Sequence, residues 1–152
     1  MALILSSADL AEIRRQAERA YPHEGCGLMG GHVAGAGEDA GAERRRVVHL
    51  VPAVNARGDS PRNRYLIEPD EFRRAHEALA RAGLDVVGVY HSHPDHPARP
   101  SAFDREHAWP RLSYVIVGVE RGVAADTRSW VLADDREDFE EEAIITEERV
   151  AI

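Results

Sequence analysis

Short apolar runs and two amphipathic stretches dominate the pattern of hydrophobic and polar residues along this chain. The runs LDVVGVYHSHP, residues 84–94, and LSYVIVGV, residues 112–119, are rich in β-branched residues and are typical of buried strands. In residues 6–22 and 69–83, apolar side chains recur every three or four positions, as on one face of a helix. The pattern therefore predicts a chain that alternates between strands and helices.

Capping and helix-ending residues set the limits of the two long helices. Ser6 or Ser7 caps the first helix and Pro22 ends it. Pro69 lies in the first turn of the second helix, and Gly83 ends that helix. The remaining predicted elements are a short helix over residues 101–109, loops over residues 34–42 and 55–64, and strands over residues 1–5, 24–33, 45–54, 65–68, 84–94, 112–119, 128–134 and 140–146.

This order of elements predicts one domain over residues 1–152, of the mixed α/β class. We expect a central mixed β-sheet flanked by two long helices and one short helix. A chain of 152 residues is long enough to bury one sizeable core. Hydrophobic residues make up 43% of the sequence and charged residues 30%, which are the proportions of an ordinary globular protein.

The charge of the chain changes the range of partners that we expect. A formal net charge of -8 argues against general binding to nucleic acid, which needs Lys and Arg gathered on one face. The cluster Arg44-Arg45-Arg46 leads into a predicted strand, and we interpret it as the solvated entrance of that strand. The acidic run DDREDFEEE, residues 134–142, is interpreted as a solvated turn and strand edge.

The cysteine content and the lengths of the apolar runs indicate the compartment. Cys26 is the one cysteine, which excludes an internal disulfide and fits a reducing cytosol. No apolar run approaches the length of a membrane span, and MALIL is too short for the apolar region of a signal peptide. We therefore expect a cytoplasmic protein that binds neither membranes nor nucleic acid.

Three histidines lie within six positions of the segment VYHSHPDHPARPSAFD, residues 89–104. Side chains alternate across a strand, so His91 and His93 face the same way, with Cα atoms about 6.6 Å apart. Two imidazoles can close that span onto one ion. Both lie at the carboxyl end of a predicted strand, where open α/β sheets tend to place ligand sites. Asp104, in the first turn of the next helix, is placed to supply a third ligand.

Two interpretations of this segment compete. Ser101 and Asp104 form a capping-box pattern, though Glu or Gln is the usual fourth residue, so both could simply cap the helix. Two imidazoles and one carboxylate also suit zinc, and three protein ligands leave a fourth position for water, as in catalytic zinc sites. Such a site needs a carboxylate base nearby. Spacing alone does not choose that base among 27 acidic residues.

The segment H-S-H-P-D-H-P-A-R-P-S-A-F-D, residues 91–104, matches a known signature at every fixed position. That signature, H-S/T-H-P-x6-S-x2-D, belongs to the JAMM (MPN-plus, JAB-domain) zinc metallopeptidases. The upstream segment P-H-E-G-C-G-L-M-G-G, residues 22–31, resembles the glutamate segment of the same family. The order of elements is similar throughout. The resemblance implies a single JAMM/MPN domain with a cytidine-deaminase-like sheet, of the small stand-alone prokaryotic type.

The resemblance also implies a role for each residue of the signature. His91, His93 and Asp104 correspond to the ligands of one zinc ion. Glu24 corresponds to the general base, which would pass a proton from the zinc-activated water to the leaving amine. Ser101 would donate a hydrogen bond to the tetrahedral oxyanion, where preorganised donors contribute strongly to acyl transfer.

The family hydrolyses peptide or isopeptide bonds after the C-terminal Gly-Gly of ubiquitin-like proteins. A ubiquitin-like or sulfur-carrier protein with such a tail is therefore the expected partner, and a homodimer is compatible with the resemblance. An extended tail can add to a sheet edge, and two glycines pass where larger side chains would clash. The loop around residues 53–64 is the candidate groove for that tail.

Several alternatives stay open beside this assignment. The chain could be a non-catalytic MPN scaffold, although such modules usually lose the zinc ligands or the glutamate. It could also be a zinc hydrolase of small peptides or amides. Cys26 would face the same side as Glu24 in a strand and could be a fourth ligand, but a buried structural thiol is favoured. His96 could line the substrate groove, but a solvated loop histidine is favoured.

Overall fold

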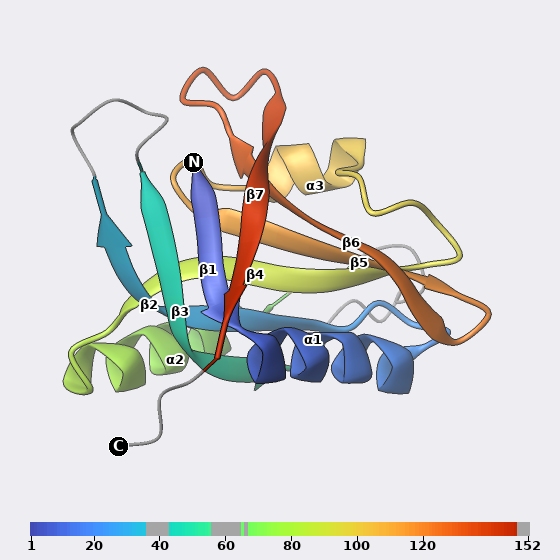
Figure 1. Cartoon of the computed structure of the whole chain (residues 1–152), viewed down its shortest axis with the longest axis horizontal. Helices are drawn as coiled ribbons and strands as arrows, with labels where there is room; N and C mark the ends of the chain where they lie inside the picture. The colour runs from blue at the N-terminus through green and yellow to red at the C-terminus, as the bar shows by residue number, and fades with distance from the viewer. Residues whose placement is uncertain (36–42, 56–64, 66, 149–152) are drawn as a thin grey trace.

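Seven strands and three helices make up the part of the chain that the structure describes (Figure 1). This computed structural model describes residues 1–35, 43–55, 65 and 67–148. The elements follow the order β1 (Ala2–Ser6), α1 (Ser7–Ala20), β2 (Cys26–Ala34), β3 (Arg44–Ala53), α2 (Pro69–Arg81), β4 (Asp85–Pro94), α3 (Ala102–His107), β5 (Ser113–Glu120), β6 (Val123–Leu132) and β7 (Phe139–Glu147). The predicted loops over residues 34–42 and 55–64 fall largely on residues 36–42 and 56–64, which lie outside the described part.

The seven strands form one mixed sheet, and its two ends meet, so that the sheet closes into a barrel. The strand order is β1-β3-β2-β4-β5-β6-β7, and the last strand returns to pair with the first. The pairs β1–β3, β1–β7 and β4–β5 are parallel, whereas the other pairs are antiparallel. The predicted mixed sheet is thus confirmed, but its closure was not predicted, because hydrophobic periodicity does not say which strands are neighbours.

Two hydrophobic clusters hold the barrel and its helices together, and β4 contributes to both. The first cluster includes Ile13 and Ala17 of α1 with Tyr90 of β4. The second includes Ala75 of α2 with Val89 of β4. Because successive side chains of a strand point to opposite faces, β4 packs on α1 with one face and on the α2 side with the other. His91 follows this alternation and lies on the face of the second cluster.

One predicted strand is wrong. Residues 65–68 read as a short strand, but the described residues Tyr65, Ile67 and Glu68 are not in a strand. Glu68 is the N-cap of α2 and accepts a hydrogen bond from the backbone N–H of Phe72, while Pro69 fills the first turn. A proline favours an extended conformation in the residue before it, and Glu68 accordingly has φ -58° and ψ 140°. Tyr65 and Ile67 pack instead against the second cluster.

The run of three arginines is not a solvated entrance, because its central member is buried. Arg45 is 0% exposed, whereas Arg44 and Arg46 point outward as the alternation of β3 requires. The Arg45 guanidinium donates to the carbonyl of Arg111 over 3.0 Å and contacts Glu43 at 3.1 Å.

The acidic run of residues 134–142 likewise ends in a buried side chain. Glu142 is 5% exposed and accepts hydrogen bonds from the hydroxyls of Ser113 and Ser129 over 2.5 and 2.8 Å. Its second oxygen, Oε2, lies 3.9 Å from Nη1 of Arg45, and neither atom has a hydrogen-bond partner among the described residues. Glu142 and Arg45 are therefore a buried ion pair, and the interpretation of both as solvated is corrected.

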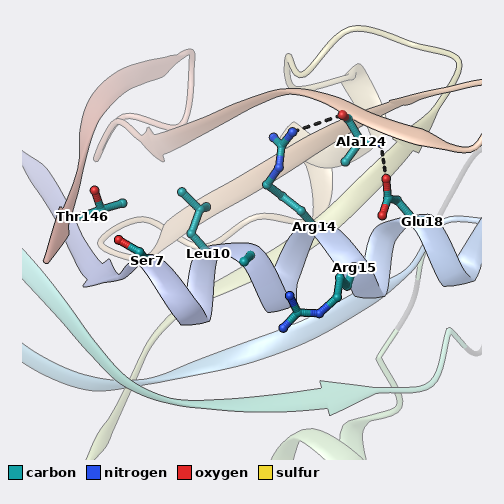
Figure 2. A pocket seen from close by; sticks show the side chains of 8 residues that line it. Ser7, Leu10, Arg14, Arg15, Glu18, Ala124 and Thr146 are labelled. Carbon is teal, nitrogen blue, oxygen red and sulfur yellow. Dashed lines mark hydrogen bonds between the residues drawn. The ribbon is translucent and has the colours of Figure 1, made fainter. Parts of the chain in front are cut away.

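Two side chains of helix α1 cover a gap in the strand pairing of the barrel, here called the seam between β6 and α1. The described pairing of β6 with β7 covers only Ser129 to Leu132, and the earlier part of β6 faces α1 on that side. Figure 2 shows Arg14 and Glu18 reaching from α1 to Ala124. Arg14 donates to the carbonyls of Ala124 and Ala125, and Glu18 accepts from the Ala124 N–H. Side chains thus satisfy backbone groups that a neighbouring strand would otherwise pair.

Candidate metal centre

The end of β4 and the first turn of α3 bring three potential metal ligands together. His91 and His93 are 2% and 8% exposed, and their Nε2 atoms are 3.2 Å apart. The Asp104 carboxylate approaches both rings, with Oδ1 3.3 Å from Nε2 of His91 and Oδ2 3.2 Å from Nε2 of His93. Three donor atoms from two elements therefore converge on one point.

The spacing of these donor atoms fits a tetrahedral metal ion. Zinc lies about 2.0–2.1 Å from nitrogen and oxygen ligands, and at tetrahedral angles each pair of ligand atoms is then about 3.3–3.4 Å apart. The two Nε2 atoms are 3.2 Å apart, and each lies 3.2–3.3 Å from a different oxygen of Asp104, so either oxygen has one imidazole at about this spacing. Two imidazoles and a carboxylate are also ligands that borderline metals accept. The donor set is suited to a divalent cation.

Glu24 completes the cluster from the segment just before β2. It is 3% exposed, and one of its carboxylate oxygens lies within 4.8 Å of a ring nitrogen of both His91 and His93. Its backbone is held on two sides. The Ser92 hydroxyl accepts from the N–H of Gly25 over 2.8 Å, and the Asn55 side chain donates to the Glu24 carbonyl over 3.0 Å.

Burial and neighbouring charge divide the carboxyl groups of the site into two kinds. Burial raises the pKa of Glu24 to about 8, with the His93 ring opposing the shift and the Asp104 charge adding to it. Burial also acts to raise the pKa of Asp104, but the two imidazoles and the Ser101 N–H outweigh it and hold that pKa well below its usual range. Asp104 is thus a fixed anion, whereas Glu24 can exchange a proton near neutral pH.

Burial likewise lowers the pKa of His91, against the opposing effect of Asp104. A lowered pKa keeps the imidazole neutral, and the neutral ring is the form that binds a metal. His93 differs, because burial acts to lower its pKa but the Asp104 carboxylate and the Pro97 carbonyl outweigh burial and raise that pKa, so a metal would compete with a proton there.

The capping interpretation and the ligand interpretation of Asp104 are both compatible with the structure. Ser101 and Asp104 form a reciprocal capping box at the start of α3, in which the Asp104 N–H donates to the Ser101 hydroxyl and Asp104 Oδ2 accepts from the Ser101 N–H. These bonds fix the carboxylate of Asp104 while both of its oxygens face the histidines. The cap therefore orients the candidate ligand.

Two other residues considered from the sequence make different contacts, although Cys26 is the partner of His91 in the pairing of β2 with β4. The Cys26 sulfur lies 3.9 Å from the Ala53 carbonyl, and burial raises the pKa of its thiol to about 12, with the charges of Glu71 and Glu24 adding to the shift. A protonated thiol fits the structural role that the sequence favoured. His96 is exposed in the loop after β4. The candidate groove around residues 53–64 falls mostly on residues 56–64, outside the described part.

Three residues around the site were missed from the sequence. Asn55 and Ser92 bind the backbone on either side of Glu24, and Tyr65 stacks on the His91 ring. The sequence pattern assigns no partner to Ser92 and places Asn55 in a loop. Contacts between distant segments carry no local signal in a sequence, so no pattern pointed to these partners.

The closed mixed sheet and the buried cluster of two histidines and two carboxylates define a small hydrolase domain with a candidate metal centre. Residues 6–133 match the family described as prokaryotic homologs of the JAB domain, and the chain belongs to this family. The resemblance drawn from the residue 91–104 signature is thereby confirmed.

Relatives with assigned names indicate the type of activity. The probable TtuB-protein conjugate cleaving protease of Thermus thermophilus is 39% identical over 116 residues, which is 76% of this chain and 69% of that protein. The desampylase of Haloferax volcanii is 36% identical over 129 residues, which is 84% of each chain. A protein of Desulfitobacterium hafniense, solved in solution, matches with a TM-score of 0.80 and 32% identity over 97% of this chain and 94% of that one. The chain is an enzyme of the protease type rather than a non-catalytic scaffold.

Proposed function

We propose that this protein is a zinc-dependent metallopeptidase that hydrolyses the bond after the C-terminal Gly-Gly of a ubiquitin-like or sulfur-carrier protein. The observation that carries the proposal is the convergence of His91, His93 and Asp104 at 3.2–3.3 Å, with the Glu24 carboxylate beside them. In this proposal the first three residues bind one zinc ion and Glu24 is the general base. Ser101 stabilises the oxyanion.

The chemistry divides between the ion and the residues of the chain. Zinc in this site supplies Lewis-acid activation of the attacking water and of the scissile carbonyl. Glu24 takes a proton from that water and delivers it to the leaving amine. The pKa of about 8 that burial gives Glu24 suits both transfers, and a bound cation would favour its ionised form. Because the Ser101 hydroxyl oxygen accepts from the Asp104 N–H, its own proton is available to the substrate oxyanion.

The substrate class is supported by the relatives and by the site. Two of them are named for cleaving protein conjugates or for desampylation. A site buried to this degree admits a thin extended tail more readily than a folded surface, and Gly-Gly is the thinnest tail available. Asn55 donates to the Glu24 carbonyl, so the described end of the segment 53–64 lies beside the proposed base.

The setting of the enzyme follows from simpler observations. We propose that residues 1–152 act as one domain in the cytoplasm, with a single buried thiol as a reducing compartment allows. No helix among the described residues is long and apolar enough to cross a membrane.

The substrate is tested with a small sulfur-carrier protein extended by one residue past its Gly-Gly. The zinc-loaded enzyme is incubated with this carrier, with a carrier whose tail is Gly-Ala, with an isopeptide-linked conjugate and with a short peptide that ends in the same sequence. Intact mass is expected to show cleavage after the second glycine of the Gly-Gly carrier or conjugate, and little cleavage of Gly-Ala. Equal cleavage of the short peptide and the carrier would instead favour a hydrolase of small peptides.

The ligand role of Asp104 is tested by Asp104→Ala. Loss of an outer-shell partner weakens metal binding by about 10–100-fold. Loss of one of three direct ligands is expected to weaken zinc binding at least as much. The matched control is Ser101→Ala, which removes the other half of the capping box and should cost about 1 kcal/mol of stability while zinc stays bound. Zinc content after dialysis and thermal unfolding are measured together. Unchanged zinc content in Asp104→Ala would leave Asp104 as a helix cap alone.

A further inference from the structure

The ring of Tyr65 lies flat against one of the candidate metal ligands. Its centroid is 4.4 Å from that of the His91 imidazole, and the two planes are inclined by 23°. Tyr65 comes from the segment before α2, far from β4 in the sequence, and packs against the second hydrophobic cluster. A residue that belongs to the core thus forms one wall of the metal centre.

The two histidines of the site are held in different ways. Nδ1 of His93 lies 2.8 Å from the carbonyl of Pro97, a hydrogen bond that leaves Nε2 free for an ion. Nδ1 of His91 is buried and has no hydrogen-bond partner among the described residues. Imidazoles that bind metals are almost always oriented by a hydrogen bond at their other ring nitrogen. Among the described residues nothing gives His91 this support, and the contact that can set the plane of its ring is the stacked Tyr65.

We propose that Tyr65 is the positioning residue of His91, an inference that rests on the proposed function only for His91 as a metal ligand. The ring of Tyr65 blocks rotation of the imidazole out of the stacked plane, and so keeps Nε2 directed at Nε2 of His93 and at Asp104. The second cluster holds Tyr65 in turn. The stack takes the place of the hydrogen bond that His93 donates from Nδ1–H to the Pro97 carbonyl.

The stack also responds to the presence of the ion. An imidazole that shares its lone pair with a cation becomes electron-poor, and the face of a tyrosine ring attracts positive charge. The contact between Tyr65 and His91 is therefore stronger when the metal is bound. A contact of this kind contributes to metal affinity, and not only to the stability of the fold.

The test separates metal affinity from core packing. Zinc dissociation constants are measured by competition with a chromophoric chelator for the wild type, Tyr65→Phe, Tyr65→Leu and Phe72→Leu. Tyr65→Phe keeps the flat ring and is expected to match the wild type, whereas Tyr65→Leu is expected to bind zinc about 10–100-fold more weakly. Phe72 packs against the same cluster, so Phe72→Leu should lower the thermal midpoint and leave zinc affinity unchanged.

Cobalt supplies a second readout that a purely structural role would not change. The visible absorption of bound Co²⁺ reports ligand geometry, and we expect an altered spectrum in Tyr65→Leu and a wild-type spectrum in Tyr65→Phe. Should Leu prevent folding, Tyr65→Met fills the space with a flexible apolar chain that has no flat face, and the same weakening is expected.

Three results would overturn the proposal. Wild-type zinc affinity in Tyr65→Leu would remove the positioning role, as would equal weakening in Phe72→Leu. Both results leave the proposed metallopeptidase intact, because the wild type binds zinc in each case. A wild type that binds no zinc would overturn the proposed function together with this inference.

Discussion

Replacement of Glu24 by Gln is expected to lower turnover of a Gly-Gly substrate by about 10²–10⁴-fold, while zinc remains bound. Gln has nearly the shape of Glu but cannot take a proton from water at neutral pH. The Ser92 and Asn55 contacts in this segment are made to backbone atoms, so the substitution leaves them in place. The loss should therefore come from proton transfer and not from a displaced loop.

The measurement combines turnover with zinc content on the same preparation. His23→Gln is the matched control, because His23 is the neighbouring residue and is exposed. It should retain the activity of the wild type. Full turnover in Glu24→Gln would exclude the base assignment, and loss of zinc from that variant would make Glu24 a ligand. Glu24→Asp keeps a carboxylate one methylene farther away and should lie between Gln and the wild type.

Replacement of Glu142 by Ala is expected to lower the free energy of unfolding by about 3–5 kcal/mol, without a direct effect on the metal centre. The variant leaves the Arg45 guanidinium fully buried with one of its two carboxylate partners removed, and only Glu43, at 3.1 Å, remaining. It also removes the acceptor of the Ser113 and Ser129 hydroxyls. Loss of a buried charge partner, together with the acceptor of two buried hydroxyls, is among the larger destabilising changes that one substitution can make.

Urea unfolding of three variants distinguishes this effect from general loss of charge. Glu141 directly precedes Glu142 and forms an exposed ion pair with Arg128. Glu141→Ala should therefore cost less than about 1 kcal/mol of stability. The double variant Arg45→Met, Glu142→Leu removes both charges and should recover most of the stability that Glu142→Ala loses. If Glu142→Ala proved as stable as Glu141→Ala, the pair would have no role in holding the barrel.

The sequence was sufficient where local rules determine geometry. Alternation along a strand placed His91 and His93 on one face, and the first turn of a helix placed Asp104 opposite them. The structure brings their donor atoms within 3.2–3.3 Å. Glu24 is different, because its segment meets β4 through contacts between distant parts of the chain, the pairing of β2 with β4 and the bond of Gly25 to Ser92. The residues alone did not single it out, and only the resemblance to a family did.

The errors arise where tertiary packing overrides local composition. Arg45 and Glu142 each lie in a run of like charge, and such runs are usually solvated. In a strand, however, side chains alternate between the two faces of the sheet. One residue of each run therefore points into the core. Tyr65 shows the opposite error, because the apolar segment around it predicts a strand and Tyr65 is not in one. It contacts the second cluster and His91 without any ladder.

The seam between β6 and α1 has a consequence for how the molecule moves. Elsewhere in the barrel a strand must separate from its neighbour before an amide can exchange with solvent, but the Ala124 N–H is released as soon as the carboxylate of Glu18 moves away. One strand, β5, lies between β6 and β4. The Ala124 amide can therefore exchange after the movement of one side chain, while the ladder between β5 and β4, the strand that carries His91 and His93, stays paired.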